Sequence, residues 1–343
     1  MPEITVMGAG IFGLSVAWCC QSLGARVQVI DPGGPGAGAS GGIVGALAPH
    51  VPEQWNAKKA FQFESLLMAE TFWAEVRSVS GLSPGYARLG RLQPIADDTA
   101  LALARVRAET AQALWQDKAC WQVVAANEHV WSPVTPSGWL IKDTLSARVH
   151  PRRACAALAA AISLRGGAIR QTGLPAGQVI WATGVHDLTA MSANMPQPVG
   201  NGVKGQAALL RFTAPDLPQL FASGVHIVPH ENGTVAIGST SERDYDDPDS
   251  TDRQLDAVIE RAMAVVPVLH GARVVARWAG LRPRSRSRAP MLGAHPLHKG
   301  QFIANGGFKI GFGMAPKVGQ VMADLVLNGH DAIPETFRPE ASL

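Results

Sequence analysis

Short apolar runs typical of strands and the helical spacing of apolar residues alternate along this 343-residue chain, and the pattern is clearest at its start. The apolar run of residues 4–7 ends in the turn Gly8-Ala9-Gly10, and a helical spacing of apolar residues then continues to Gly24. A second apolar run, residues 26–30, ends at Asp31. This order predicts a strand, a tight turn, a helix and a second strand.

Longer-range patterns predict the remaining elements. Residues 179–184 read as a buried strand that returns beside the first one in a parallel sheet. Short alternating runs in residues 120–142 and 203–240 predict antiparallel strands. Apolar residues at three- and four-residue spacing, with proline, glycine and acidic signals at the ends, predict helices over residues 60–79, 99–116, 151–164, 252–266 and 315–328.

The glycine spacing after the first strand predicts a dinucleotide site. Gly8 permits the turn, Gly10 lets the backbone reach a pyrophosphate, and Gly13 lets helix and strand pack closely. Asp31 is placed to accept hydrogen bonds from a ribose 2′-hydroxyl and to repel a 2′-phosphate, which argues against NADP. A glycine turn in some other βαβ unit is the alternative.

Residues 33–45, which follow Asp31 directly, are rich in glycine and nearly lack bulky side chains. Such a stretch is either a flexible linker or a backbone that lies against a flat, polar ligand. Its position after the ribose-binding acid favours the second interpretation.

Composition sets the class of protein. With 47% apolar and 17% charged residues, the chain is expected to be an ordinary soluble globular protein, and its 343 residues are enough for two packed domains. The first strand leaves no room for a signal peptide, and no apolar run reaches the roughly 20 residues of a membrane span. We therefore expect a cytoplasmic protein. The four cysteines lack metal-ligand spacing, so we expect reduced core residues and no metal site.

The formal net charge of +3 gives no strong general field, so binding to nucleic acid would need a local basic patch. Arg282, Arg284, Arg286 and Arg288 alternate along the chain, which predicts four cations on one face of an extended segment. This face is either a solvated edge with one functional member or a surface for an anionic macromolecule.

Several ordered motifs narrow the dinucleotide to a flavin. They are Gly38-Ala39-Ser40-Gly41, Ala182-Thr183-Gly184, Trp278-Ala279-Gly280-Leu281-Arg282-Pro283, Pro290-Met291-Leu292-Gly293 and the glycine-rich residues 306–316. In these motifs the chain resembles the D-amino-acid oxidase superfamily of FAD enzymes, most closely its glycine oxidase and sarcosine oxidase branch. The resemblance spans nearly the whole chain.

The resemblance implies an α/β fold of the glutathione-reductase-2-like type. A Rossmann-type FAD-binding domain would comprise residues 1–49, 143–198 and 285–343, and an inserted antiparallel-sheet substrate domain residues 50–142 and 199–284. FAD would be non-covalent, because no cysteine lies near Ala289-Pro290-Met291, where sarcosine oxidases bond to flavin. The FAD contacts implied are Gly8, Gly10, Ile11, Phe12, Gly13, Asp31, Pro32, Ala39, Ser40, Gly41, Gly45, Ala46, Ala182, Thr183, Gly184, Arg282, Gly307, Phe308, Lys309, Ile310 and Gly311.

The reaction implied is oxidation of the C–N bond of a small amino acid or N-alkyl amino acid. Hydride passes to flavin N5, the imine hydrolyses, and O2 is reduced to H2O2. The start of the last helix, near Ala315, would stabilise negative charge on the reduced ring.

Four side chains would act at this site. Arg282 would grip the substrate carboxylate. Lys309, where glycine oxidases carry an arginine, would hold a carboxylate or help draw electrons to oxygen. His50 aligns with a family histidine near the flavin, although a structural hydrogen-bonding role is equally open. His226 replaces a tyrosine that contacts substrate.

Two departures from the family affect the expectations. Only Arg170 to Gln178 joins two elements where the family carries a strand meander over the adenine, which predicts an exposed adenosine and weaker FAD retention. Ser241 and Ala46 replace methionines that narrow the glycine oxidase pocket. The pocket should therefore be roomier and more polar, and glycine itself is a doubtful substrate.

Other functions stay open at this point. The loop of residues 41–49 also resembles the FAD domain of the bifunctional tRNA wobble-uridine modification enzyme, which removes a carboxymethyl group from an amine. A dehydrogenase that uses another electron acceptor, or a flavin binder without catalysis, are further alternatives. The substrate, its chirality and the oligomeric state are not determined by the sequence.

Overall fold

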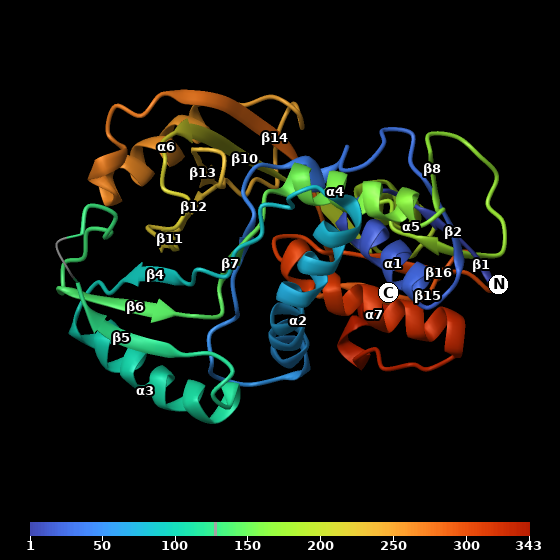
Figure 1. Ribbon diagram of the computed structural model, residues 1–343, viewed down its shortest axis with the longest axis horizontal. Helices are drawn as coiled ribbons and strands as arrows, with labels where there is room; N and C mark the ends of the chain where they lie inside the picture. Colours follow the sequence, from blue (N-terminus) through green and yellow to red (C-terminus); the bar gives the residue numbers. More distant parts are fainter. Residues whose placement is uncertain (127–128) are drawn as a thin grey trace.

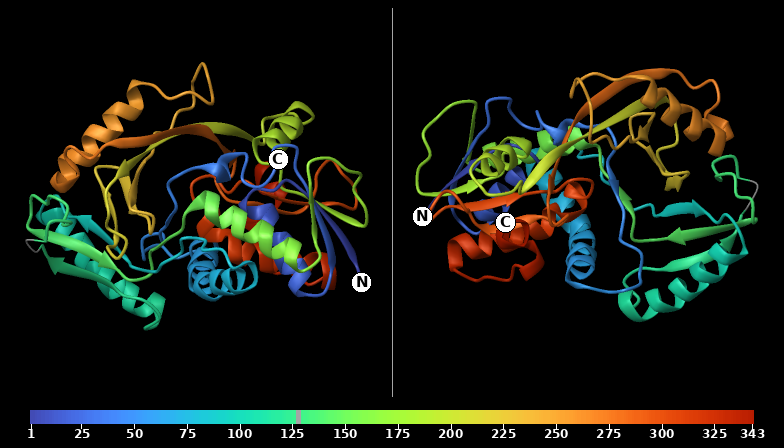
Figure 2. Two further views of the ribbon diagram at one scale, coloured as in Figure 1. Left: turned by 45° about the horizontal axis from the view of Figure 1, so that its top comes forward. Right: turned by 180° about the vertical axis from the view of Figure 1, so that it is seen from behind.

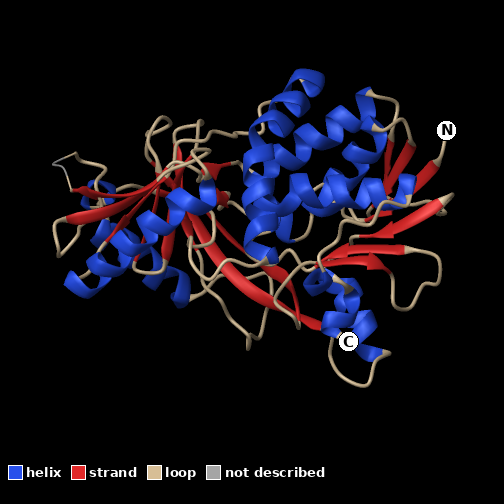
Figure 3. Cartoon of the chain, turned by 90° about the horizontal axis from the view of Figure 1, so that it is seen from below, coloured by secondary structure: helices blue, strands red, loops and turns tan. Residues whose placement is uncertain are grey.

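Two large sheets lie beside each other in the molecule, with most of the long helices gathered against the first (Figures 1 and 3). The structure, a computed structural model, describes residues 1–126 and 129–343. Residues 127 and 128, which belong to the predicted strand region 120–142, lie outside the described residues.

The first sheet has six strands in the order β15-β16-β9-β1-β2-β8. All neighbouring pairs are parallel except β15 with β16. Val6 is opposite Val29 on one side and Ile180 on the other, so the three predicted strands are neighbours, as expected. The strands are β1 (Glu3–Met7), β2 (Arg26–Ile30), β8 (Ala168–Arg170), β9 (Gln178–Trp181), β15 (Met291–Ala294) and β16 (Phe302–Asn305).

The helices of this half share one apolar core with the sheet. Leu14 and Trp18 on α1 and Met314 on α7 are fully or almost fully buried in it. α1 packs against α7 and α4, and α2 packs against the same two helices. The helices are α1 (Ile11–Ser22), α2 (Ala57–Ser80), α4 (Pro151–Leu164), α5 (Val185–Ala193) and α7 (Gly311–Asn328).

The second sheet has eight strands in the order β14-β10-β13-β12-β11-β4-β6-β5, with α3 (Asp98–Trp115) and α6 (Arg253–Val265) packed on it (Figure 2). It is antiparallel as predicted, except that β11 runs parallel to β4. The strands are β4 (Arg91–Pro94), β5 (Trp121–Ala125), β6 (Trp139–Asp143), β10 (Gly200–Arg211), β11 (Gln219–Ala222), β12 (Val225–Pro229), β13 (Thr234–Gly238) and β14 (Val274–Ser285). Two short strands, β3 (Ala46–Leu47) and β7 (Ala147–Arg148), form a separate antiparallel pair.

The predicted start of the last helix at Ala315 is wrong by about one turn. α7 begins at Gly311, because the turn before it closes with a hydrogen bond from Ile310 N to Gly307 O and the helix continues with Met314 N to Ile310 O. Pro316 therefore lies inside the helix. Proline is common at the first helical position, but here it is the sixth residue of the helix.

The prediction of four arginines on one extended face is also wrong. β14 ends at Ser285, so only Arg282 and Arg284 belong to the strand. Arg282 is buried, whereas Arg286 is exposed and donates to the carbonyl of Leu343. Arg288 lies in a turn with φ of 59°. The end of β14 therefore separates Arg286 and Arg288 from the two arginines of the strand, and no single extended face carries all four.

Cys20 and Cys155 are buried as expected, but Cys120 is exposed. An exposed loop, residues 171–175, begins the connection from the edge strand β8 to β9. The domain boundaries stay a prediction, and α2, which they assign to the substrate domain, packs on helices of the other half. None of the described helices is both long and apolar enough to cross a membrane.

Candidate active site

A cavity of about 770 Å³ opens at the carboxyl ends of β1, β2 and β9 and continues along β14 to the turn before α7. Met7, Ile30 and Trp181 mark these strand ends in its wall. Ligands of open parallel sheets bind at this edge, because the connections leave a crevice there.

The three glycines of the first turn have different surroundings. Gly8 has φ of 108°, and a Cβ there would lie 2.4 Å from the carbonyl oxygen of Ala182. A Cβ on Gly13 would lie 2.0 Å from the carbonyl oxygen of Gly8. Gly10 lines the cavity, and its nearest neighbour would be Ser40 Oγ at 3.4 Å. Gly8 and Gly13 thus hold the turn together, and Gly10 leaves the cavity open.

Two side chains tie the glycine-rich segment to this turn. The Asp31 carboxylate accepts hydrogen bonds from Ala9 N at 2.7 Å and Gly33 N at 2.9 Å. Ser40 Oγ accepts one from Ile11 N at 2.9 Å, at the start of α1. The segment therefore lies along the cavity wall.

The start of α7 forms the opposite wall. Phe308 N donates to Pro283 O at 3.0 Å, which fixes the turn of residues 306–310 against β14. Gly311 and Phe312 line the cavity, and their N–H groups have no hydrogen-bond acceptor among the described residues. Such free N–H groups at a helix start carry partial positive charge.

Arg282 is buried in the wall between these two regions. Its Nη1 donates to Ser239 Oγ at 2.7 Å, and its Nη2 donates to the carbonyls of Lys204 and Thr240 at 3.2 and 2.6 Å. The guanidinium has five N–H donors, and its Nε–H and one N–H of Nη1 take no part in these hydrogen bonds. Burial lowers the pKa of Arg282 to about 10, with Glu242 acting in the opposite direction, so the side chain stays protonated at neutral pH.

His226, on β12, also faces this cavity. Its ring lies against Phe221 with 4.6 Å between centroids, and its Nδ1 has no partner among the described residues. Burial, followed by the charges of Arg91 and Lys309, lowers its pKa to about 4. His226 is therefore neutral at physiological pH.

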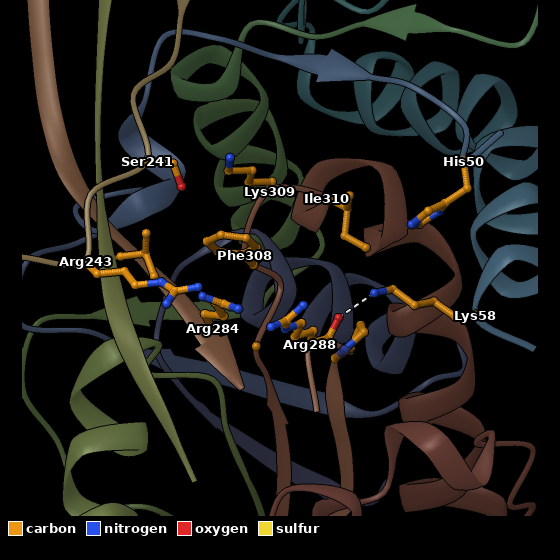
Figure 4. Close-up of a pocket in the computed structure, with 12 residues that line it drawn as sticks. His50, Lys58, Ser241, Arg243, Arg284, Arg288, Phe308, Lys309 and Ile310 are labelled. Atoms are coloured by element: carbon orange, nitrogen blue, oxygen red, sulfur yellow. Dashed lines mark hydrogen bonds between the residues drawn. The ribbon is translucent and has the colours of Figure 1, made fainter. Parts of the chain in front are cut away.

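A second cavity of about 460 Å³ is also lined by the turn before α7 (Figure 4). Phe308 and Lys309 line both cavities, whereas His50 and Ile310 line only the smaller one. Gln62 holds His50 in place by accepting hydrogen bonds from its backbone N–H, at 2.8 Å, and from its ring Nδ1. Burial lowers the pKa of His50.

Most predicted site residues therefore meet in one place. The residues that line the larger cavity are Gly8, Gly10, Ile11, Phe12, Asp31, Pro32, Ala39, Ser40, Gly45, Ala46, Ala182, Thr183, Gly184, His226, Arg282, Gly307, Phe308, Lys309 and Gly311. Gly13 and Gly41 lie behind its wall. A Cβ on Gly45 would lie 1.8 Å from Val149 O, so this glycine is also required by the fold.

Sequence reasoning missed several wall residues. Ser239, which accepts from Arg282, carried no sequence signal. Neither did Asn305, which donates to Gly184 O at 2.9 Å and accepts from Gly306 N at 2.7 Å. Lys58 and Arg243, in the smaller cavity, lie far from the motifs in the sequence. Only the tertiary fold brings such residues together.

The larger cavity fits FAD and is called the FAD cavity. Its volume lies in the ordinary range of cofactor sites, which is about 300–1,000 Å³. Gly10 and Asp31 are placed for a pyrophosphate and a ribose, and the N–H groups of Gly311 and Phe312 for the flavin. Thr183 Oγ1, His226 Nδ1 and Arg282 Nε are buried in its wall without a partner among the described residues. Buried polar atoms without partners point to a ligand.

Comparison with known proteins agrees with this geometry. The family model described as FAD dependent oxidoreductase matches residues 3–325. The chain is 28% identical to the glycine oxidase of Pseudomonas putida, covering 99% of each protein, and 25% identical to that of Geobacillus kaustophilus, covering 94% of this chain and 92% of the relative. The crystal structure of glycine oxidase from Geobacillus kaustophilus matches with a TM-score of 0.83 at 20% identity, over 98% of both chains.

Proposed function

Because this chain belongs to the family of FAD dependent oxidoreductases, it is an FAD-using enzyme, and we propose that it oxidises the C–N bond of a small amino acid or N-alkyl amino acid. The membership confirms the resemblance seen in the motifs, and the fold agrees with it. The relatives named glycine oxidase support the substrate class.

One observation carries the proposal. At one end of the FAD cavity, the unpartnered Arg282 Nε and His226 Nδ1 lie in the same wall as Lys309. Arg282 and Lys309 offer N–H donors and positive charge to a carboxylate. His226 offers a neutral nitrogen to the amine. A carboxylate and an amine on one carbon are the two groups that define an amino acid.

The chain's part in the reaction is mainly positioning. FAD, when bound, supplies the acceptor for the two electrons and the hydrogen that leave the substrate's Cα. Arg282 and Lys309 fix the carboxylate, which orients the Cα–H bond and limits the substrate to one pose. With a pKa of about 4, His226 stays neutral and does not repel a substrate ammonium. The resulting imine takes up water and gives an oxo acid together with ammonia or, from an N-alkyl amino acid, an amine.

We further propose O2 as the electron acceptor, with H2O2 as product. The ammonium of Lys309 forms no ion pair with any acid in the described chain, so it can attract the negative charge that develops on oxygen. An amino acid dehydrogenase with another acceptor is the alternative that a peroxide measurement distinguishes.

The test is an anaerobic screen of FAD-loaded protein with amino acids and N-alkyl amino acids. We expect at least one of them to bleach the visible absorbance of the oxidised flavin, and aeration to restore it with one H2O2 per substrate. Bleaching without peroxide on aeration would indicate a dehydrogenase. Absence of bleaching with every compound, in protein that dithionite reduces, would refute the proposal.

A further inference from the structure

The smaller cavity is strongly cationic. Among the residues that the structure describes, five cationic side chains and no acidic one line it (Figure 4); the five are Lys58, Arg243, Arg284, Arg288 and Lys309. The rest of the wall is neutral or apolar, with Val203, Pro290 and Ile310 among its members. Only Lys309 of this group was predicted to act in catalysis.

These cations come from separate elements that the fold brings together. Arg284 lies near the end of β14, and Arg288 lies in the turn that follows, with a left-handed φ of 59° that non-glycine residues seldom adopt. Lys58 is the second residue of α2, where the helix dipole disfavours a cation, and its Nζ donates to the carbonyl of Arg288. Lys58 thus holds its charge where the helix dipole opposes it, and Arg288 adopts a backbone conformation that costs free energy. Such costs cluster at functional sites.

In the part of the chain that the structure describes, no acidic side chain neutralises this cluster. Within the described ranges, no acidic side chain reaches ion-pair distance of any of the five. Burial, followed by repulsion from Arg288 and Arg243, lowers the pKa of Arg284. Burial, Arg282 and Arg284 together lower that of Lys309. The cluster therefore repels itself until an anion enters.

Phe308 connects this cavity to the reacting end of the FAD cavity. Its ring centroid lies 5.6 Å from both the Arg284 guanidinium and the Lys309 ammonium, and 5.7 Å from the Arg282 guanidinium. The same ring lines both cavities. An anion held by Arg284 would thus lie one aromatic ring away from a carboxylate held by Arg282.

We propose that the smaller cavity binds a second anionic group of the substrate, one that carries two or more negative charges, such as a phosphate or a polycarboxylate. This inference rests on the proposed function, and it narrows the substrate to an amino acid whose N-substituent or side chain ends in such a group. A single carboxylate would leave most of the cationic charge unmatched, which is why a multiply charged group fits better.

A compact anion fits this site better than a nucleic acid does. Asp244, Asp246, Asp247 and Asp249 follow Arg243 in the chain and are all exposed, and Asp249 also lines the FAD cavity. A long polyanion that passed over this segment would meet four negative charges. On the side of this segment, negative charges therefore border the cationic cavity.

The experiment measures binding and turnover separately. Calorimetry on FAD-loaded protein at low ionic strength uses pyrophosphate and citrate as ligands, with acetate as the singly charged comparison. The variants are Arg284→Gln, Arg288→Gln and Lys58→Met, with Arg286→Gln as the matched control, since Arg286 lines neither cavity. Melting temperatures identify any variant that fails to fold, and the three independent substitutions keep the test decisive.

We expect both polyanions to bind more tightly than acetate, and each cavity variant to raise their Kd about tenfold or more. Arg286→Gln should change Kd less than about twofold, as for an exposed charge outside the site. No binding of either polyanion, or equal losses in Arg286→Gln and the cavity variants, would overturn the proposal. So would a ten-nucleotide RNA that binds more than tenfold tighter than pyrophosphate, because it would indicate a nucleic-acid surface.

The substrate arm compares N-propylglycine with N-(3-phosphonopropyl)glycine as flavin reductants. We expect kcat/KM to favour the phosphonate in the unmodified enzyme and Arg284→Gln to remove that preference. Equal kcat/KM values for the two compounds would overturn the inference. If no amine reduces the flavin, the proposed function fails, and the calorimetry still decides whether the cavity binds polyanions.

Discussion

The carboxylate of Asp31 accepts a 2.7 Å hydrogen bond from the backbone N–H of Ala9, so the end of β2 is fixed to the glycine turn that follows β1. The same carboxylate lines the FAD cavity. One acid therefore both holds the turn and faces the position expected for a ribose.

Replacing this acid should weaken FAD binding. In Asp31→Asn, one carboxylate oxygen becomes an amide NH2 that cannot accept from Ala9 N or from a ribose hydroxyl. We expect the Kd for FAD, measured by fluorescence titration of the apoprotein, to rise about ten- to a hundredfold. Asp117→Asn, on an exposed turn of the other half, is the matched control and should leave the Kd unchanged. An unaltered Kd in Asp31→Asn would contradict the assignment.

Alanine at two glycines of one turn should impair different properties, FAD binding in one case and folding stability in the other. In Gly10→Ala the new Cβ has room beside Ser40, so the protein should fold but lose most of its FAD affinity. In Gly13→Ala the Cβ would lie 2.0 Å from Gly8 O, which should cost about 2 kcal/mol or more of unfolding free energy. Chemical denaturation and FAD titration of both variants check this. The assignment fails if Gly10→Ala binds FAD normally.

The short connection between β8 and β9 should leave FAD easy to lose. Residues 171–175 are exposed, Leu174 is 87% exposed, and none of residues 171–178 lines the FAD cavity. We expect dialysed, diluted protein to release part of its flavin, measured as the rise in free FAD fluorescence. Retention of a full complement at nanomolar concentration would show that the rest of the cavity compensates.

Two buried histidines should make stability fall in acid. Burial lowers the pKa of His226 and of His230 from the ordinary 6.5 to about 4. Above pH 6.5 both histidines are neutral in the folded and in the unfolded chain, so their titration does not change stability there. Between pH 6.5 and 4 the unfolded chain takes up protons that the folded chain does not, so the unfolding free energy falls by up to about 1.4 kcal/mol per pH unit for each histidine.

The check is denaturant unfolding at pH 7.5 and pH 5 with and without His226→Gln. Glutamine does not titrate, so the variant should lose less stability on acidification than the unmodified protein. Identical losses would mean that His226 is protonated as readily in the folded as in the unfolded state.

Arg282 should act mainly on substrate binding. Lysine in its place keeps one charge but cannot supply donors to Ser239, two carbonyls and a carboxylate together. We expect Arg282→Lys to raise KM at least about tenfold, with a smaller change in kcat. Ser239→Ala, which removes one acceptor of the guanidinium and leaves its charge, should have a milder effect. A kcat loss without any change in KM would argue against carboxylate binding.

The elements with strong local signals could be predicted closely. α4 runs from Pro151 to Leu164 as expected, because proline favours the first helical position and the glycines after the helix end it. The start of α7 was predicted less well, because a hydrogen-bonded turn of residues 307–310 sets its first residue.

The FAD cavity was largely predictable because its glycines and Asp31 act through local backbone geometry. The smaller cavity was not, since its cations lie at positions 58, 243, 284, 288 and 309 and no periodicity links them. The alternating arginines suggested one charged face, but the end of β14 at Ser285 divides them. Proximity of this kind is a property of the tertiary fold.

The turn that carries Phe308 and Lys309 is a wall common to two cavities. Thermodynamic linkage then requires reciprocity between their occupants: if a polyanion in one changes the affinity for FAD in the other, FAD changes the affinity for the polyanion by the same factor. Cofactor loading and recognition of the charged end of the substrate are, through this one turn, a single coupled equilibrium.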